Sequence, residues 1–503
     1  MKAHLTAQAR SRRERGPEAI AWFRAAWGRE MGWNRRYSLV SHVRSSLWIV
    51  PLVAVIAAMV LKRVAVALGE WLVKAHGYDT QNGFLSVSAE EAHAILDRIF
   101  TLNLSCLVFT FSSLLVAIQI AGGQYTPRII ATTLLRNNVI RWVVGLFVFS
   151  MLWTHRTMIE IGQSDVIPQL QVALATAIGL ASLVAFILLI DYSARLLRPV
   201  SLVCRVAEQG FTVIRNVYPD QLPDQEESTS SDDAAVAEVD KARTKREPPN
   251  RVVILHGRSG VVLAVNLPGL VLEAQRADCF IEFAVQVGDF VATDEPLFYL
   301  YGNSGALSDR RLQSLVALGS ERTMEQDPMF AFRIEVDIAL KALSPAINDP
   351  TTAVLAIDQL HRLLRMVGKR SLANREIYDR GGQPRVAFYT PDWEDYVHIC
   401  FREIRIAGAG SIQIDRRLRA MIDNLTITLP VSHRAALRRE LDLLDAAIEC
   451  EKILKEDALL ARIGDTQGIG GSSVASSARS RPRHVVSMPQ DRQSGVSDGS
   501  AKR

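Results

Sequence analysis

Four long runs of apolar residues, separated by polar segments, dominate the first 200 positions of this sequence. A run of roughly 20 apolar residues is long enough to cross a bilayer as a helix. The pattern therefore predicts four transmembrane helices, at about 45–65, 99–121, 139–158 and 170–190. We expect an α-helical membrane protein whose transmembrane domain occupies residues 45–198.

The second run is unusually polar for a membrane helix. Its polar residues fall mostly at spacings of three and four, which places them on one face of a helix. In hydrocarbon such a face needs either a protein partner or water, so it packs against other helices or lines a pore. Because these groups are neutral, we favour packing. The residues concerned are Asn103, Cys106, Thr110, Ser113 and Gln124.

The fourth run carries four alanines at steps of four, namely Ala173, Ala177, Ala181 and Ala185. A ridge of small residues lets a second helix approach closely. We therefore interpret these alanines as a helix-packing surface.

Charged residues flank the runs unevenly. Arginines follow the second run and the fourth, whereas the loop between the first two runs is mainly acidic. Lys and Arg are enriched on the cytoplasmic side of membranes, so both termini are predicted to be cytoplasmic. Lys62 and Arg63 lie near the far end of the first run, where we expect their charged ends to reach the interface.

Beyond the fourth run the pattern becomes that of a soluble α+β region. Basic residues and an aromatic belt before the first run predict an interfacial helix. The predicted divisions are a basic cytoplasmic N-terminus (1–44), the transmembrane domain (45–198), a helical exit and disordered linker (199–250), a small β domain (251–303), a mainly helical domain (304–463) and a disordered tail (464–503).

Short β-rich runs separated by glycine, proline and aspartate fill the segment 251–302. This spacing is typical of a small β-barrel or sandwich. The segment contains no lysine, so we expect no prosthetic group attached to one.

Helical periodicity then resumes from about residue 307. A helix is predicted from Met329 to about Leu343, with Arg333 and Asp337 spaced for an ion pair one turn apart. It should end at Ser344-Pro345, because proline disfavours helix for the residue before it.

Asp349 and Pro350 have the character of an N-cap and a first helical residue, and this predicts that a second helix begins there. The intervening loop allows two interpretations. Capping alone accounts for the aspartate. Alternatively, the oxygens of Ser344, Asn348 and Asp349 bind a small polar ligand or a cation, or dock another subunit. We favour capping.

The sequence holds no recognisable catalytic or metal-binding motif. Its five cysteines have no paired spacing, and its histidines are far apart. The net charge of +5 is small for 503 residues and does not indicate nucleic-acid binding. We therefore predict a protein that is not an enzyme and that uses no cofactor and no metal.

Two segments carry a family resemblance. Gln124–Arg128 reads QYTPR, and Asp337–Ala353 reads DIALKALSPAINDPTTA. Here the chain resembles the bacterial membrane proteins grouped as domain of unknown function 2254 (DUF2254). The signature positions are Tyr125, Thr126, Pro127, Arg128, Ser344, Pro345, Asn348, Asp349 and Pro350. The resemblance implies a multi-pass protein of the bacterial inner membrane with a cytoplasmic C-terminal region. It implies no activity.

Three functions are compatible with these patterns. The first is a membrane-anchored sensor or scaffold, whose cytoplasmic domain binds a small polar ligand or a protein partner. The second is an oligomeric channel or transport-like protein, with the second run lining the pore. The third is a membrane enzyme acting on lipid or an envelope precursor, for which we find no nucleophile or metal cluster. The bilayer and further copies of the chain are the expected partners.

Overall fold

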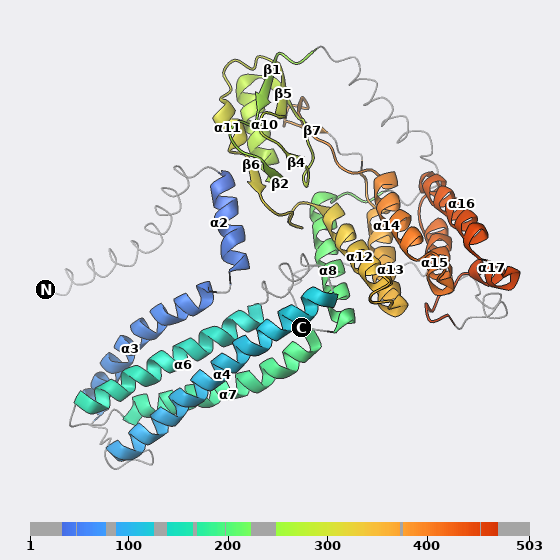
Figure 1. Cartoon of the computed structure of the whole chain (residues 1–503). Coiled ribbons are helices and arrows are strands. Elements are labelled where there is room, and N and C mark those ends of the chain that lie inside the picture. The colour runs from blue at the N-terminus through green and yellow to red at the C-terminus, as the bar shows by residue number, and fades with distance from the viewer. Residues whose placement is uncertain are drawn as a thin grey trace, which may run out of the picture.

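The chain folds into a bundle of long helices and an α+β region set off from it (Figure 1). The computed structural model describes residues 33–46, 48–76, 87–124, 138–163, 169–196, 198–222, 248–372, 376–452 and 454–470. Outside them lie the first 32 residues, which hold most of the predicted interfacial helix, the acidic linker at 223–247 and the tail after residue 470.

The bundle consists of α3 (Ile49–His76), α4 (Ala89–Gln124), α6 (Asn138–Gln163) and α7 (Gln169–Leu196). In the described part of the chain these four helices are long and apolar enough to cross a membrane, which confirms the four predicted spans. Helix α6 contacts all three of the others, and α4 also packs on α7. Each helix extends past the C-terminal end of its predicted run, and the added turns include polar residues.

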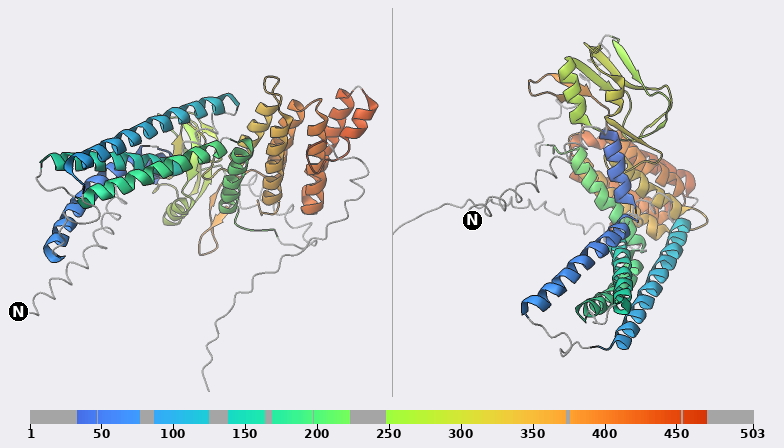
Figure 2. Two further views of the ribbon diagram at one scale, coloured as in Figure 1. Left: turned by 90° about the horizontal axis from the view of Figure 1, so that it is seen from below. Right: turned by 90° about the vertical axis from the view of Figure 1, so that its left-hand side faces the viewer.

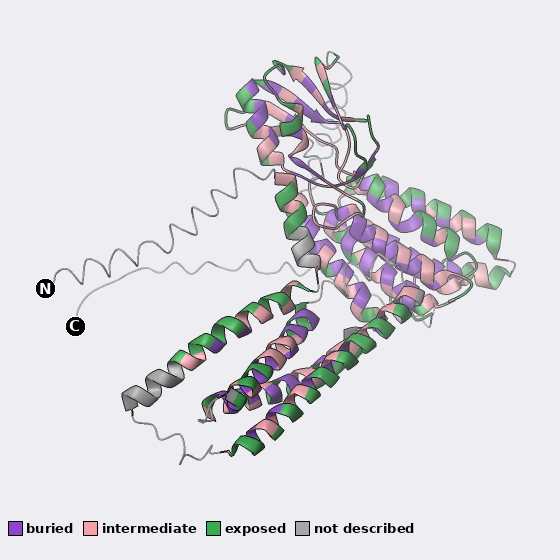
Figure 3. Ribbon diagram, turned by 60° about the vertical axis from the view of Figure 1, so that its left-hand side comes forward, coloured by how far each residue is buried: buried purple, intermediate pink, exposed green. Residues whose placement is uncertain are grey.

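Much of the bundle is exposed, as the green stretches of its helices show (Figure 3), and many of the exposed residues are large and apolar. Met59, Leu115 and Leu188 are each about 60% exposed, at 65%, 59% and 63%. In water such a surface would be unfavourable, whereas hydrocarbon solvates it well. The exposure is therefore that of a surface facing lipid.

A helical domain follows the bundle. It is built from α8 (Pro199–Val217), α12 (Pro328–Leu343), α13 (Pro350–Val367), α14 (Trp393–Ala407), α15 (Ile412–Thr428), the short 3₁₀ helix η2 (Val431–His433), α16 (Arg434–Glu451) and α17 (Lys455–Ala461). These helices share one large apolar core. Figure 2 shows α8 standing between the bundle and the remaining helices.

Helix α8 was predicted as an exit from the membrane, but it is also a core element. One face buries eight residues, among them Val206 and Gly210, against α12 and α13. At Gly210 an added Cβ would lie 2.8 Å from the Cβ of Ala331, so glycine permits this close approach. Core packing of this density fixes the orientation of α8 relative to the domain.

Helices α8 and α13 run side by side in the same direction. The Arg362 Nη2 atom lies 2.9 Å from Glu208 Oε1, and further along, Arg370 donates a 2.7 Å hydrogen bond to the Pro219 carbonyl. The start of α13 therefore lies beside the start of α8, where α8 leaves the bundle.

Two open sheets form the β region. The first has the order β1-β5-β3-β8-β7 and the second β4-β2-β6. The strands are β1 (Arg251–Ile254), β2 (Gly260–Val265), β3 (Cys279–Phe283), β4 (Phe290–Val291), β5 (Pro296–Gly302), β6 (Val316–Gly319), β7 (Glu376–Tyr378) and β8 (Pro384–Ala387). Pairing is antiparallel except between β3 and β8.

Of the expected β-barrel or sandwich, the barrel is wrong, because the sheets are open and no closed barrel forms in the described residues. Helix α10 (Leu267–Ala277) interrupts the strands and packs against β3 and β8, so a helix covers the core of the first sheet. The short helix α11 (Asp309–Gln313) precedes β6. Strands β6, β7 and β8 lie beyond residue 303, where the small β domain was predicted to end. Of these, β8 pairs with β3 inside the first sheet.

Two segments near the ends of the described chain are attached to the α+β region. Helix α2 (Trp33–Ser45) packs on β6, and the Asn34 backbone N–H donates a 3.0 Å hydrogen bond to the Ser314 carbonyl. At the other end, Arg416 donates a 2.9 Å hydrogen bond to the Gly470 carbonyl. Residues 464–470, at the start of the tail that was predicted to be disordered, thus contact the buried side chain of Arg416.

Candidate functional site

The polar face of α4 is turned mainly toward protein. Asn103, Cys106 and Thr110 are buried, with 1%, 6% and 5% of their surface exposed. The Asn103 side-chain amide donates a 3.2 Å hydrogen bond to Ser150 Oγ on α6 and a 2.9 Å bond to the Ile99 carbonyl. These contacts are those of interhelical packing, because the polar groups find partners within the chain.

The remaining predicted residues of this face are placed differently. Ser113 is exposed, and its hydroxyl donates a 3.0 Å hydrogen bond back to the Thr110 carbonyl. Gln124 is the last residue of α4, and its side chain lies outside the description. Outside the described residues too are the signature positions Tyr125, Thr126, Pro127 and Arg128.

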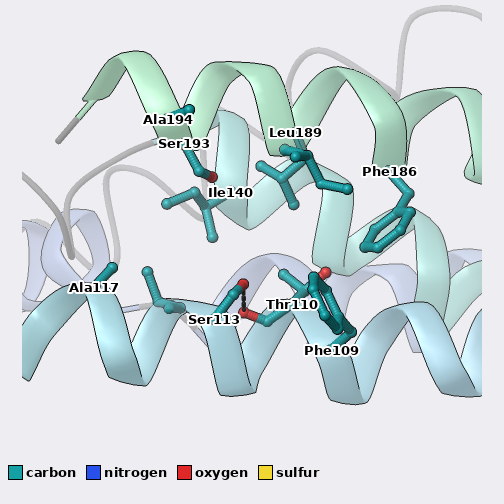
Figure 4. A pocket seen from close by; sticks show the side chains of 11 residues that line it. Phe109, Thr110, Ser113, Ala117, Ile140, Phe186, Leu189, Ser193 and Ala194 are labelled. Atoms are coloured by element: carbon teal, nitrogen blue, oxygen red, sulfur yellow. Dashed lines mark hydrogen bonds between the residues drawn. The ribbon is translucent and has the colours of Figure 1, made fainter. Parts of the chain in front are cut away.

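A cavity of about 260 Å³ lies between α4 and α7, with Ile140 of α6 at its side. Thr110, Ser113 and Ala117 line it from α4, so part of the predicted polar face reaches it. In Figure 4 the side chains of Ser113 and Ser193 extend into the space between the two helices. The rest of the lining is apolar, being Phe109, Leu114, Phe186, Leu189, Ile190 and Ala194.

The four alanines of the fourth span do not form the packing face of α7 within one chain. Ala177 and Ala181 are exposed, and Ala173 and Ala185 are only partly buried. The buried face of α7 is offset by about half a turn and carries Ala175, Gly179 and Ser182 among others. The interpretation of these alanines as a helix-packing surface stays a prediction.

A charged cluster joins three spans at the opposite end of the bundle. The Lys62 ammonium of α3 lies 3.1 Å from Glu160 Oε2 and donates a 2.8 Å hydrogen bond to Thr157 Oγ1, both on α6. It also donates to the Gln171 side-chain carbonyl on α7 and lies 5.2 Å from the centre of the Trp153 ring. Three acceptors thus satisfy the three N–H groups of the ammonium.

This cluster corrects the prediction for Lys62, which is buried inside the bundle with 5% of its surface exposed. Ionisable residues within spans are expensive to place there, so those that occur usually pair and carry structure or function. Sequence reasoning missed the partner because Glu160 lies 98 positions further along the chain. A lysine inside an apolar run was the available signal.

The predicted helix pair of the signature segment is confirmed. Helix α12 ends at Leu343, with Ser344 as its C-cap, and Arg333 Nη2 lies 2.6 Å from Asp337 Oδ1. Asp349 is the N-cap of α13, with Pro350 in its first turn.

Both carboxylate oxygens of Asp349 are used inside the loop. Oδ1 accepts a 3.1 Å hydrogen bond from the Thr352 backbone N–H, and Oδ2 accepts a 2.5 Å bond from the Thr352 hydroxyl. Asn348 has a φ of +49°, a left-handed conformation that asparagine tolerates better than most residues. The Ser344 hydroxyl bonds the Lys341 carbonyl, and Pro345 is exposed. This geometry is that of a capped turn.

Glu335 of α12 is a buried acid that sequence reasoning missed. Its side chain is fully buried, and within the described residues neither carboxyl oxygen has a hydrogen-bond partner. Burial raises the pKa of Glu335 well above 4.5, because an unpaired charge is disfavoured away from water. A single glutamate in a helical run carries no signal that would separate it from a surface residue.

In the described part of the chain, no group of three His, Cys, Asp or Glu side chains has the arrangement of a metal site.

Comparison with known proteins gives the family. A family described as "Predicted membrane protein (DUF2254)" matches residues 44–424. The chain belongs to this family. The DUF2254 match covers all four spans and both signature segments, and it ends within α15.

Similar full-length proteins occur in mycobacteria. Uncharacterized proteins of Mycobacterium bovis and Mycobacterium tuberculosis are each 22% identical to this chain over 472 residues, which is 91% of this chain and 85% of the relative. No solved structure matches the chain. Membership of DUF2254 therefore identifies the chain as a predicted membrane protein. The family name gives no activity, so the activity has to be argued from the structure.

Proposed function

We propose that this protein is a membrane-anchored sensor or scaffold, whose soluble region binds a ligand or partner and is mechanically joined to the spans at two places. The soluble region lies on the cytoplasmic side of a bacterial inner membrane, as the loop charges predict. It is the double attachment of the soluble region that carries the proposal, since one flexible tether would suffice for a simple anchor.

The first attachment precedes the first span. Helix α2 ends at Ser45 and α3 begins at Ile49, so only three residues separate them. The backbone hydrogen bond from Asn34 to Ser314 and the packing of Trp33 on the β-region core hold α2 on the soluble side. Movement of the β region would therefore be carried to α3 through a short connection.

The second attachment follows the fourth span. Only two residues separate the end of α7 from the start of α8, which is buried in the helical domain. The core of that domain continues into the bundle, where Ile140, Val144 and Leu189 belong to the same buried cluster. A shift of α12 or α13 would be transmitted through α8 to α6 and α7, because packed cores move as units.

The channel alternative has less support. A pore lined by α4 needs its polar face to meet water, but Asn103, Cys106 and Thr110 are buried within one chain. In planar bilayers we expect the purified protein to give no unitary conductance. A conductance abolished by Thr110→Phe would favour the channel instead.

The test of coupling uses Asn34→Pro, which removes the backbone N–H that bonds Ser314 while proline remains tolerated in the first turn of a helix. Asn34→Ala is the matched control, because it keeps that N–H. We expect hydrogen–deuterium exchange of the full chain in nanodiscs to rise in β6 and also in α3 for Asn34→Pro alone. A rise confined to β6 would show that the soluble region is not coupled to the spans.

A further inference from the structure

The cavity between α4 and α7 is lined by apolar side chains and three hydroxyl groups, and it lies toward the end of α7 that leads into α8. At one end of the cavity lie Phe109 and Phe186, whose rings meet edge to face with centroids 5.8 Å apart. Its other end holds Ile140 and Ser193, which lie close to the start of α6 and the end of α7. The cavity thus runs along α4 and α7 from these two rings toward the junction of α7 with α8.

The helices that form the cavity also carry exposed apolar side chains of the kind that face lipid. On α4, Leu115 and Val116 are 59% and 52% exposed, and on α7, Ile187 and Leu188 are 59% and 63% exposed. In the sequence these residues directly follow Leu114 and Phe186, which line the cavity. A hydrocarbon chain of the bilayer therefore reaches it without crossing water.

Arginines adjoin cavity-lining residues in the sequence at this end, since Arg141 follows Ile140 and Arg195 follows Ala194. The start of α6 (138–141) and the α7–α8 junction (191–205) carry four arginines against one aspartate. Arg205 lies 3.4 Å from the Tyr192 hydroxyl, one residue from cavity-lining Ser193. Arg195 is paired with Asp191, and the net charge of these segments remains positive. An anionic headgroup at this depth would be attracted.

We propose that the cavity binds one acyl chain of an anionic phospholipid, with the phosphate held at the arginine-rich end. The acyl chain lies between α4 and α7, and the lipid headgroup lies where α7 passes into α8. The apolar interior accounts for the acyl chain, and the excess of arginine accounts for the preference for a negative headgroup over a zwitterionic one. The proposal rests on the cavity and on the arginines of the adjoining segments, and it does not depend on the proposed coupling.

The test uses the full-length chain in detergent micelles, with phosphatidylglycerol or phosphatidylcholine added back and thermal unfolding followed by tryptophan fluorescence. We expect phosphatidylglycerol to stabilise the protein at a lower concentration than phosphatidylcholine does. Equal stabilisation by the two lipids would overturn the headgroup assignment.

Two matched pairs of variants locate the site. Ser113→Phe fills the cavity, whereas Ser112→Phe places the same ring on an exposed neighbour that does not line it. Arg205→Gln removes a charge at the arginine-rich end, whereas Arg215→Gln removes one near the other end of α8. We expect Ser113→Phe to lose the lipid response and Arg205→Gln to need about fivefold more phosphatidylglycerol, with both controls unchanged.

If Ser113→Phe does not fold, Ser193→Leu fills the same cavity from α7 and takes its place. A lipid response that survives cavity filling would overturn the proposal. So would a filled variant that changes the oligomeric state by light scattering while keeping its lipid response, because a second copy of the chain would then occupy the cavity.

Discussion

Replacing Lys62 by methionine tests whether the charged cluster holds α3 on the bundle. The substitution keeps an unbranched apolar stem of similar reach and removes the ammonium that joins α3 to Glu160, Thr157 and Gln171. Breaking a buried ion pair by removing one partner typically costs about 3–5 kcal/mol, since the other charge stays buried. The Glu160 side chain is 27% exposed and keeps some contact with solvent, so we expect about 3 kcal/mol.

A double variant distinguishes the loss of the attraction between Lys62 and Glu160 from the cost of leaving the Glu160 charge buried without its partner. When an ion pair is replaced by apolar residues, the change in stability is often neutral or favourable. We therefore expect Lys62→Met combined with Glu160→Met to recover most of the loss. Arg63→Met is the control, because Arg63 is exposed beside Lys62 and should change stability by less than about 0.5 kcal/mol.

The assay is reversible unfolding of the full chain in mixed micelles, followed by fluorescence, with Trp153 beside the Lys62 ammonium as a local reporter. If Lys62→Met changed the free energy of unfolding by no more than Arg63→Met does, the structural role of the cluster would be refuted. A double variant as unstable as the sum of the single ones would show that Lys62 and Glu160 do not interact.

Three further changes test the helical domain by thermal unfolding. Asp349→Ala should cost about 1 kcal/mol and Asp349→Asn almost nothing, because asparagine also caps well; loss of stability in the asparagine variant would contradict capping. Glu335 takes up a proton on folding, so native stability should fall as pH rises above 4.5, and Glu335→Leu should remove that fall and gain about 1–3 kcal/mol at pH 8. Unchanged pH dependence would show that the acid is not buried. Gly210→Ala should destabilise by about 1–3 kcal/mol through overpacking on Ala331, whereas Gly162→Ala, with nothing within 4 Å of the new Cβ, should not. Equal stability of the two variants would contradict the close packing of α8.

The parts of the fold that depend on local sequence were predictable. Run length defined the four spans, and the Asp349-Pro350 pair defined the start of α13, because hydrophobic length and capping act within a few residues. Helix α10 was missed, since Pro268-Gly269 indicates a turn, whereas in the structure Pro268 lies in the first turn of the helix and Asn266 caps it through the Gly269 N–H.

Features that depend on distant residues could not be predicted. The parallel pairing of β8 with β3 joins segments about 100 positions apart, and no local pattern encodes it. For the same reason the partner of Lys62 and the docking of α2 on β6 were not visible in the sequence. The polar face of α4 could be recognised from periodicity, but whether it met water or protein required the positions of α6 and α7.

Sided labelling of cysteines tests most directly the claim that the soluble region is cytoplasmic and the bundle spans the membrane. Cys450 on α16 is exposed, and at Gly162, near the far end of α6, nothing lies within 4 Å of a new Cβ. In intact cells a membrane-impermeant maleimide should label Gly162→Cys and leave Cys450 unlabelled until the membrane is permeabilised. Labelling of Cys450 in intact cells would contradict the account.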